Sequence, residues 1–404
     1  MEEQLRAQFK QADGSVIPFY SKSNQNELTE KKIELTRLIE MGHNQGFISD
    51  SDFKEMTPNG KAARLYGQPK VHKPIPEGKN IPPCRPICSQ SGANSEYASK
   101  FVDIHSKDLL KKIPTYLEDT AHFLRFLEES NQEGLTEECF PVTVDVTALY
   151  TNIPAEGTNG GLEAFKKALE TREDKTVPSW YLKTLLKQVL ASNIFEFNGQ
   201  LWRQCIGTAM GTMVAPTYAC LFMSHLEQEI LSSWGGTQPL LFKRFIDDIF
   251  FIWPGREEEL KEFIAHLNNA HTHIKFTSTY DVQTKSIPFL DTWVTLKEGK
   301  FITDLFKKPS ARCQYLLPSS CPSLYQTTSI FYSLAYRLRR ICSDNETFEL
   351  RLTELKNDLL SRNYSGKTID SEIRKAKAIT REEALKKVVK DENSRQVLVV
   401  VYLV

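Results

Sequence analysis

The sequence lacks any hydrophobic run long enough to cross a membrane. Its longest apolar stretch, Val397–Val404, has eight residues, whereas a membrane-spanning helix needs about 20. The polar N-terminus also lacks the pattern of a signal peptide. We therefore expect an intracellular protein that does not enter a membrane. The composition of Val397–Val404 predicts a buried strand, and a chain that stops inside such a strand is expected to be a truncated product.

Closely spaced metal-binding cysteines are also missing. The chain has 8 cysteines, and the closest pairs are Cys84/Cys88 and Cys313/Cys321. Neither pair has zinc-finger spacing or nearby histidine partners. This excludes the zinc-finger classes, and we expect reduced thiols, which are usual inside cells.

Net charge is absent as well, because 51 basic residues balance 51 acidic ones. The distribution is uneven, however. Residues 61–112 contain ten Lys or Arg and four acids, and residues 300–340 contain seven and one. A neutral protein with such basic stretches can still present a positive groove to a phosphate backbone.

The pattern of apolar residues predicts a mixed α+β chain. The Pro-rich stretch Tyr66–Ile87 must be extended or looped, because proline breaks helices. Expected strands and hairpins are Phe140–Val146, Ile194–Gln204 around the turn Asn198-Gly199, Leu240–Trp253 with Asp247-Asp248 at its tip, and short strands up to Phe306. Expected helical regions are the polar segment Met1–Thr57, Phe101–Leu110, Thr120–Glu129, Gly161–Glu170, Ser179–Ser192, a helix opened by Pro216, Arg256–Ala270 and most of Ser329–Lys390.

Three carboxylates stand where a folded protein rarely places them. Asp145 lies inside the apolar strand Val142–Val146, and Asp247 and Asp248 interrupt the apolar stretch Phe245–Phe251. A buried carboxylate needs a cation or strong hydrogen bonds. One reading is that Asp247 and Asp248 only form a polar turn. The other is that the three acids hold two Mg²⁺ ions for phosphoryl transfer. Asp247 is then the stronger candidate of the adjacent pair, because neighbouring strand residues point to opposite faces.

Several further motifs occur in a fixed order around these acids. They are Tyr66–Pro74, Arg85–Ile87, Val144–Pro154, Gln204–Pro216, Arg244–Asp248 and Pro288–Asp291. With these motifs the chain resembles, from about Leu65 to Val404, the reverse transcriptases of Penelope-like retroelements. Telomerase and group II intron enzymes are more distantly similar. A nuclease module with a Gly-Ile-Tyr signature, which many such relatives carry, is not found here.

The resemblance implies an α+β right-hand polymerase fold with fingers, palm and helical thumb. The palm would hold an antiparallel sheet with packed helices. We expect an N-terminal segment and fingers at 1–137, a palm at 138–295, and a thumb with the start of a truncated C-terminal region at 296–404.

The resemblance also implies an RNA-directed DNA polymerase of retrotransposon origin. Asp145, Asp247 and Asp248 would be catalytic and would hold two Mg²⁺ ions, or Mn²⁺, with the Val146 carbonyl as an extra ligand. The partners would be an RNA template, a DNA primer and deoxynucleoside triphosphates. A nuclear location is expected, and the oligomeric state is left open.

Roles for other residues follow from the same resemblance. The nucleotide site would comprise Lys70, Arg85, Tyr150, Gln204, Gly207, Met210 and Gly211. The primer grip would be Phe289, Leu290 and Asp291, and the nucleic-acid track would be Lys307, Lys308, Arg312, Arg337, Arg339 and Arg340. Lys275 is a weaker candidate as proton donor to pyrophosphate. For each of these residues the alternative is an ordinary packing or solvated side chain.

Two other functions compete with reverse transcription. One is a viral-type RNA-dependent RNA polymerase, against which Tyr150 argues, because its ring would clash with a ribose 2′-hydroxyl. The absence of glycine before Asp247 argues in the same direction. The other is an inactive remnant that only binds nucleic acid, which the intact acids disfavour.

Overall fold

The fold is taken from a computed structural model of the chain. It describes residues 8–10, 16–71, 73–75, 77–78, 80–131, 135–136, 138–309, 311, 314–320 and 323–387. The strand expected at Val397–Val404 and the predicted track residue Arg312 lie outside these ranges. No helix in the described ranges is both long enough and apolar enough to span a bilayer.

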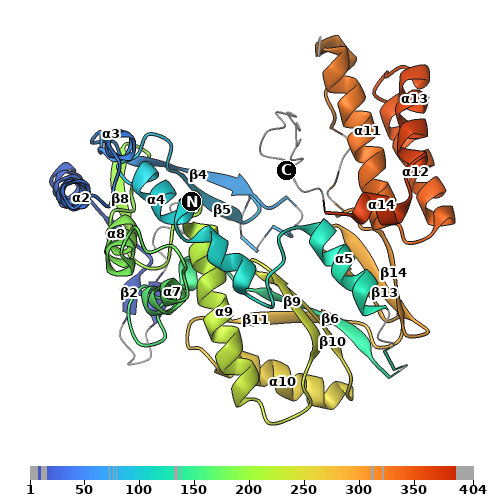
Figure 1. Cartoon of the computed structure of the whole chain (residues 1–404), viewed down its shortest axis with the longest axis horizontal. Helices are drawn as coiled ribbons and strands as arrows, with labels where there is room; N and C mark the ends of the chain where they lie inside the picture. The colour runs from blue at the N-terminus through green and yellow to red at the C-terminus, as the bar shows by residue number, and fades with distance from the viewer. Residues whose placement is uncertain are drawn as a thin grey trace.

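A four-stranded antiparallel sheet occupies the centre of the molecule (Figure 1). Its order is β11 (Phe276–Tyr280), β6 (Phe140–Val146), β10 (Asp248–Trp253) and β9 (Leu240–Phe245). Alternate residues of β10 enter two different cores, with Ile249, Phe251 and Trp253 on one face and Phe250 and Ile252 on the other. The apolar run after Asp248 therefore reflects a strand that is buried on both faces.

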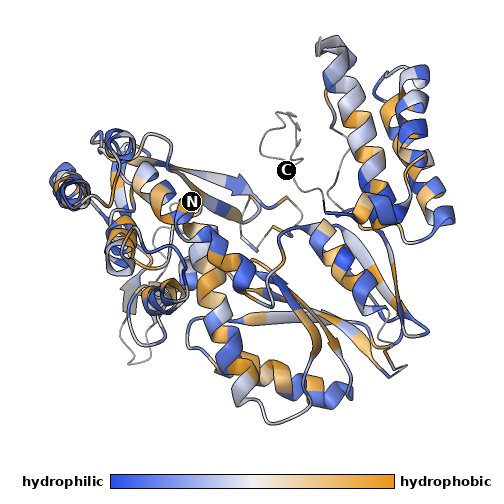
Figure 2. Ribbon diagram, viewed as in Figure 1, coloured by the Kyte–Doolittle hydropathy of each residue, from blue (hydrophilic) through white to orange (hydrophobic). Residues whose placement is uncertain are grey.

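Helices cover one face of this sheet. α9 (Ala215–Ser233) and α10 (Glu257–Asn269) lie on this face. α7 (Gly161–Glu170), the 3₁₀ turn η1 (Lys107–Lys112) and the short α6 (Leu149–Asn152) pack on α9, and α8 (Ser179–Ala191), α4 (Glu96–Ile104), α2 (Gln25–Asn44) and α3 (Asp50–Met56) extend the same core away from the sheet. Pro216 lies in the first turn of α9, as predicted. Figure 2 shows apolar residues concentrated along α9 and the central strands, where the largest core lies.

The opposite face packs against α5 (Thr120–Ser130) and a second antiparallel sheet. That sheet has the order β12 (Ser286–Phe289), β13 (Thr292–Lys297) and β14 (Lys300–Leu305). Phe289 packs between Phe123 of α5 and Phe250 of β10, with ring centroids 4.7 and 5.4 Å away. These contacts fix the β12–β13 turn beside the central sheet.

A five-stranded sheet lies at the other side of the molecule. Its order is β3 (Tyr20–Lys22), β8 (Gln200–Gln204), β7 (Ile194–Phe197), β4 (Ala63–Pro69) and β5 (Cys84–Ser89). The predicted hairpin turn has positive φ at Asn198 and Gly199. The described residues of the Pro-rich stretch lie in β4, in β5 and in the irregular segment between them, which agrees with the prediction of an extended or looped chain. The prediction that Met1–Thr57 is helical was wrong at three strands. Tyr20–Lys22 pairs with β8, which is remote in sequence, and Gln8–Lys10 pairs with Val16–Pro18. Another strand pair, β1 (Gln8–Lys10) and β2 (Val16–Pro18), precedes β3.

The C-terminal part is helical and has a core of its own. It consists of α11 (Leu324–Ile341), α12 (Asn345–Leu360), α13 (Gly366–Lys377) and α14 (Arg381–Leu385). Phe331, Leu352 and Leu359 are among its buried residues. α14 joins this part to α5, since Arg381 forms an ion pair with Glu128. The observed class is thus α+β, as predicted.

Candidate active site

The three acids lie together at one end of the central sheet. Asp248 begins β10 and stands opposite Asp145 on β6. Directly opposed residues of an antiparallel pair project from the same face, so these two carboxylates share a face. Asp247 belongs to the two-residue turn with Ile246, whose φ is +56°. The prediction placed both acids at the tip, whereas Asp248 is the first paired residue of the strand.

A backbone hydrogen bond ties the turn to the neighbouring strand. The Val146 amide donates to the Asp247 carbonyl at 3.0 Å. The side chain of Val146 is buried in the core, so a ligand role for this residue would rest on its carbonyl oxygen alone and stays a prediction.

Burial and mutual repulsion raise the pKa values of the acids at this end of the sheet. Burial, followed by the charges of Asp247 and Asp145, raises the pKa of Asp248 to about 7. Burial, and then the charge of Asp145, also raises the pKa of Asp247. Each of these carboxylates disfavours the ionisation of its neighbours, and a divalent cation bound beside them would offset their negative charge.

The carboxylates of Asp145, Asp247 and Asp248 provide only some of the ligands that a Mg²⁺ ion needs. Carboxylate oxygens are suitable ligands, and Mg²⁺ typically takes one or two protein carboxylates together with substrate phosphates. Within the described ranges, no group of three or more His, Cys, Asp or Glu side chains is gathered closely enough to hold a metal ion. An ion here would therefore need further ligands besides these side chains, such as substrate phosphates, water or a backbone carbonyl.

Arg244 stabilises the turn that carries Asp247. No role for this residue was predicted from the sequence. Its side chain is fully buried and forms an ion pair with Glu227 of α9. One guanidinium nitrogen donates to the Ile246 carbonyl at 3.1 Å and another to the Cys220 carbonyl at 3.1 Å. The Thr115 hydroxyl donates to Glu227 at 2.7 Å. Two sequence features could have indicated this ion pair: Arg244 stands close to the acids, and Glu227 interrupts an otherwise apolar helix.

Cations of the β4–β5 hairpin face the acids. Burial raises the pKa of Asp145, while the positive charges of Lys73 and Lys70 oppose that rise. Arg85 acts on Asp247 in the same way. Among the described residues, the side chains of Lys70, Lys73 and Arg85 have no hydrogen-bonded or ion-paired partner. The predicted nucleotide-site residues Lys70 and Arg85 thus lie near the acids with their charges unpaired.

The Gly207–Gly211 loop fits closely against two other segments. Gly207 has φ of +72°, and a Cβ there would collide with the backbone of Tyr150 and Thr151. The Thr208 amide donates to the Tyr150 carbonyl at 2.7 Å. Gly211 has φ of +122° and lies against the Cys88 carbonyl in the same manner. Both positions therefore require glycine.

Three other predicted nucleotide-site residues border this loop. The Met210 carbonyl accepts a hydrogen bond from the Cys88 amide at 2.7 Å. The Tyr150 ring is close enough to Asp247 for that charge to add to the rise in tyrosine pKa that burial causes. Gln204 instead turns inward, since it is buried and its amide donates to the Ile206 carbonyl at 2.8 Å. Its position supports shaping of the loop rather than direct contact.

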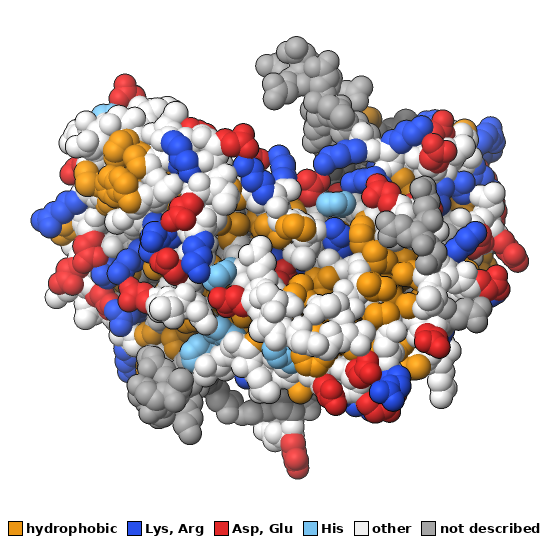
Figure 3. Space-filling view, turned by 60° about the horizontal axis from the view of Figure 1, so that its bottom comes forward, with side chains coloured by type: hydrophobic (Ala, Val, Ile, Leu, Met, Phe, Trp, Pro, Cys, Tyr) orange, Lys and Arg blue, Asp and Glu red, His pale blue; other side chains and the backbone are white. Residues whose placement is uncertain are grey.

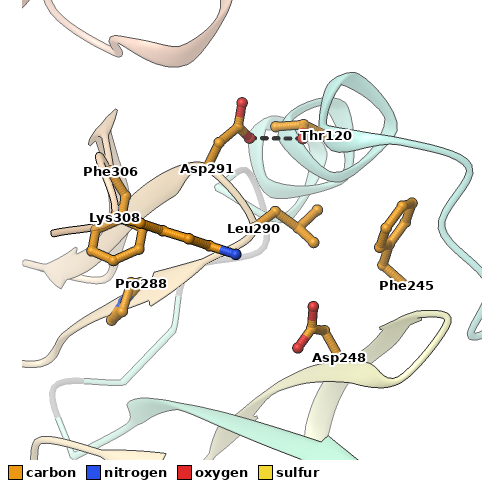
Figure 4. Close-up of a pocket in the computed structure, with 8 residues that line it drawn as sticks. All are labelled: Thr120, Phe245, Asp248, Pro288, Leu290, Asp291, Phe306 and Lys308. Carbon is orange, nitrogen blue, oxygen red and sulfur yellow. Dashed lines mark hydrogen bonds between the residues drawn. The ribbon is translucent and has the colours of Figure 1, made fainter. Parts of the chain in front are cut away.

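A cavity of about 490 Å³ opens beside Asp248 (Figure 4). Its lining residues are Thr120, Phe245, Asp248, Pro288, Leu290, Asp291, Phe306 and Lys308. In Figure 4 the Lys308 ammonium points into the space between Leu290 and Asp248. Four of these residues were not predicted to belong to the site, namely Thr120, Phe245, Pro288 and Phe306.

The predicted primer-grip residues differ in what they contact. Leu290 and Asp291 form the β12–β13 turn and line the cavity, whereas Phe289 is a core residue. Asp291 accepts a hydrogen bond from the Thr120 hydroxyl at 2.7 Å and forms an ion pair with Arg337 of α11. This turn therefore connects the cavity to the C-terminal helices.

Most cations of the predicted nucleic-acid track have partners inside the protein. Arg339 donates to the Asn345 side chain at 2.7 Å, and Arg340 donates to the Ala384 carbonyl at 2.8 Å. Lys307 lies 3.4 Å from Glu354 and 3.5 Å from Asp358. Lys308 has no such partner within the described ranges. The predicted track therefore contributes mainly Lys308 to the site.

The candidate proton donor Lys275 points away from the acids. Its ammonium donates to the Asn268 carbonyl at 2.7 Å and to the His271 carbonyl at 3.3 Å. In this arrangement the side chain closes the C-terminal end of α10, so a role in proton transfer would require it to leave both carbonyls.

Two solved polymerase structures are similar to this chain over most of its length. Telomerase from Candida albicans, solved with a fragment of telomeric RNA, matches with a TM-score of 0.51 and 11% identity, covering 81% of this chain and 64% of that one. The RNA-dependent RNA polymerase of a human picobirnavirus matches with a TM-score of 0.50 and 13% identity, with the same coverages of 81% and 64%. The chain spans less than two thirds of the length of either.

At the level of sequence, a known family model matches one segment of the chain. The profile of the animal helix-turn-helix domain matches residues 314–374, which include α11, α12 and most of α13. A search of curated proteins gave no match. The structural similarity to these polymerases shows that the chain has their right-hand fold. The assignment of the four-stranded sheet to the palm, of the β4–β5 hairpin to the fingers and of the C-terminal helices to the thumb stays a prediction.

Proposed function

We propose that this chain is an RNA-directed DNA polymerase that extends a primer 3′-hydroxyl with deoxynucleotides. One observation carries the proposal. Asp145 and Asp248 stand opposite each other beside the Asp247 turn, with unpaired cations on one side and the cavity on the other. The order of the motifs supports a Penelope-like retroelement origin, and with it a nuclear location.

The chain's own residues would divide the work as follows. Asp145 and Asp247 would hold the metal ions, with Asp248 as the third acid. When bound, two Mg²⁺ ions stabilise the attacking and leaving oxygens of an in-line phosphoryl transfer. Lys70 and Arg85 would bind the triphosphate, where fixed cations offset developing charge. The cavity beside Leu290 and Lys308 would receive the primer end.

Tyr150 would select the sugar. Its backbone carbonyl accepts a hydrogen bond from the Thr208 amide of the Gly207 loop, and its ring is close enough to Asp247 to be affected by that charge. This proximity to the acids supports a role in excluding a 2′-hydroxyl. The Arg244–Glu227 pair would keep the Asp247 turn in place without touching substrate.

Primer extension with purified protein tests the proposal. On poly(rA)/oligo(dT) with Mg²⁺, we expect extension with dTTP and much slower extension with UTP. Efficient extension with UTP would instead favour an RNA polymerase, the activity that the picobirnavirus neighbour is named for. Binding of the primer–template without any extension would favour the inactive remnant.

A further inference from the structure

The turn between β12 and β13 holds one residue in a backbone conformation that its side chain disfavours. The turn consists of Leu290 and Asp291, because Phe289 and Thr292 pair with each other directly before and after it. Leu290 has φ of +55°, a region for which two-residue hairpin turns usually supply Gly, Asn or Asp. Strained positions of this kind persist only where surrounding contacts hold them. Leu290 also lines the cavity beside Asp248, so its conformation shapes the candidate site.

The Asp291 carboxylate is shared by two helices from distant parts of the chain. One oxygen accepts a hydrogen bond from the Thr120 hydroxyl at the start of α5, at 2.7 Å. The other accepts from Arg337 of α11, whose Nε lies 2.8 Å away and whose Nη2 makes a second contact. The backbone carbonyl of Asp291 also accepts from the Phe306 amide at 2.9 Å. Asp291 is thus held by three different segments, directly beside Leu290.

Stability alone does not account for this ion pair. The side chains of Arg337 and Asp291 are exposed by 46% and 26%, and ion pairs this open to water add little to the free energy of folding. The pair does fix geometry, because two guanidinium nitrogens and one hydroxyl leave the carboxylate few other orientations. The contacts therefore favour a role in positioning the turn.

Both partners of the ion pair are poorly placed to bind nucleic acid directly. A carboxylate repels phosphate, and both oxygens of Asp291 already accept hydrogen bonds. The charge of Arg337 is offset by Asp291, whereas the Lys308 ammonium points into the cavity (Figure 4). The predicted primer contact of Asp291 and the predicted track role of Arg337 therefore have less support than a joint role inside the protein.

The same contacts connect the cavity to the C-terminal helices. α11 packs against both α5 and β14. Figure 3 shows a hollow between the lobe with α2–α4 and the lobe with α11–α14, with Lys and Arg side chains on both sides. A nucleic acid in this hollow would touch the C-terminal lobe, and a shift of α11 would reach Leu290 through Arg337 and Asp291.

We propose that Arg337 and Thr120 are positioning residues, which act through Asp291 to hold Leu290 where the proposed function places the primer end. The shape of the cavity then depends on the position of α11, so nucleic acid bound against the C-terminal lobe is coupled to the primer end. This inference rests on the proposed function and gives Asp291 a task inside the protein instead of a contact with the primer.

Amide hydrogen exchange of the full chain tests this linkage without catalysis. Arg337→Gln removes the ion pair and should raise exchange within residues 286–293, which contain the β12–β13 turn, because a released Leu290 can leave its disfavoured conformation. Asp291→Asn should have the same effect. The double variant should be no worse than either single one, since all three remove the same interaction. Unchanged exchange, or fully additive increases, would overturn the inference.

Arg351 provides the matched control. It forms an ion pair with Asp304 of β14, so it also joins a C-terminal helix, α12, to the sheet of β12–β14. It is not among the described residues that line the cavity. Arg351→Gln should leave exchange within residues 286–293 unchanged. An increase equal to that of Arg337→Gln would show a general loosening of the C-terminal helices and would also overturn the inference.

Primer extension and equilibrium binding then separate positioning from direct contact. On poly(rA)/oligo(dT) with dTTP, Arg337→Gln should lower kcat about tenfold, because the primer end is misaligned, while the affinity for primer–template and its salt dependence change little. Weaker binding with a flatter salt dependence would mean that Arg337 contacts phosphate, which contradicts the inference. A wild-type protein that extends no primer would refute the proposed function, whereas the exchange experiment would still decide whether Arg337 holds the turn.

Discussion

At the scale of single residues, the position of Asp247 depends on a buried ion pair. Arg244 is fully buried, pairs with Glu227 and holds the Ile246 carbonyl. Removing one partner of a buried pair leaves an uncompensated charge, whereas replacing both with apolar residues is often tolerated. This contrast separates the stability of the pair from its positioning role.

We expect Arg244→Met to lower the free energy of unfolding by about 3–5 kcal/mol. The double variant Arg244→Met/Glu227→Leu should recover much of that loss, as measured by urea denaturation. It should nevertheless stay slow in primer extension, because the Ile246 carbonyl is still unbraced. A double variant as unstable as the single one, or one with wild-type kcat, would contradict this assignment.

Tyr150 allows a second test at the same scale. Tyr150→Ala should lower the ratio of kcat/KM for deoxynucleotides over ribonucleotides by roughly tenfold, which is about 1.4 kcal/mol. The reason is that removal of the ring relieves the clash with the 2′-hydroxyl and leaves the acids in place. If both substrates were slowed alike, Tyr150 would be a packing residue.

At the scale of elements, the segment after β14 shows what local sequence does not reveal. Lys307 and Lys308 are adjacent and look equivalent as a basic pair. In the structure, Lys307 lies near Glu354 and Asp358 of α12, whereas Lys308 points into the cavity beside Asp248. The partners of Lys307 are about 50 positions away in the sequence, so only the packing of α12 distinguishes the two lysines.

Lys308→Gln should therefore weaken primer–template binding and reduce the slope of log affinity against log salt by about one phosphate contact. Lys307→Gln is the matched control and should change that slope little, since its charge is already paired. Equal effects of the two substitutions in a salt titration would show that the ion pairs of Lys307 open when nucleic acid binds.

The difference between local and long-range contacts also explains which elements could be predicted from the sequence. Phe140–Val146 and Gly161–Glu170 have the predicted bounds, because their apolar periodicity is local. β3 was missed because its partner β8 is remote in sequence. Likewise, the basic residues between Lys307 and Arg340 were predicted to form a nucleic-acid track, but the Arg340 side chain donates to the Ala384 carbonyl. Acids inside apolar strands could be located from the sequence. Whether a given Lys or Arg is paired within the protein depends on tertiary contacts, which the sequence does not reveal.

At the scale of the whole molecule, zero net charge conceals a local separation of charge. Acids gather at one end of the palm sheet, and unpaired cations lie on the β4–β5 hairpin and at Lys308. This arrangement suits a substrate that carries phosphates and metal ions together. The domain boundaries at 137/138 and 295/296 and the roles of the individual site residues stay predictions.

The most direct test of the central claim is primer extension by Asp247→Asn beside the wild type. We expect Asp247→Asn to lower kcat/KM on the order of a hundredfold or more, because the substitution neutralises a predicted metal ligand. RNA binding and stability should be retained, since the substitution relieves repulsion from Asp145 and Asp248. Asp281→Asn is the matched control, because Asp281 caps a turn after β11 and should leave extension unchanged. Near-normal extension by a folded Asp247→Asn protein would contradict the account.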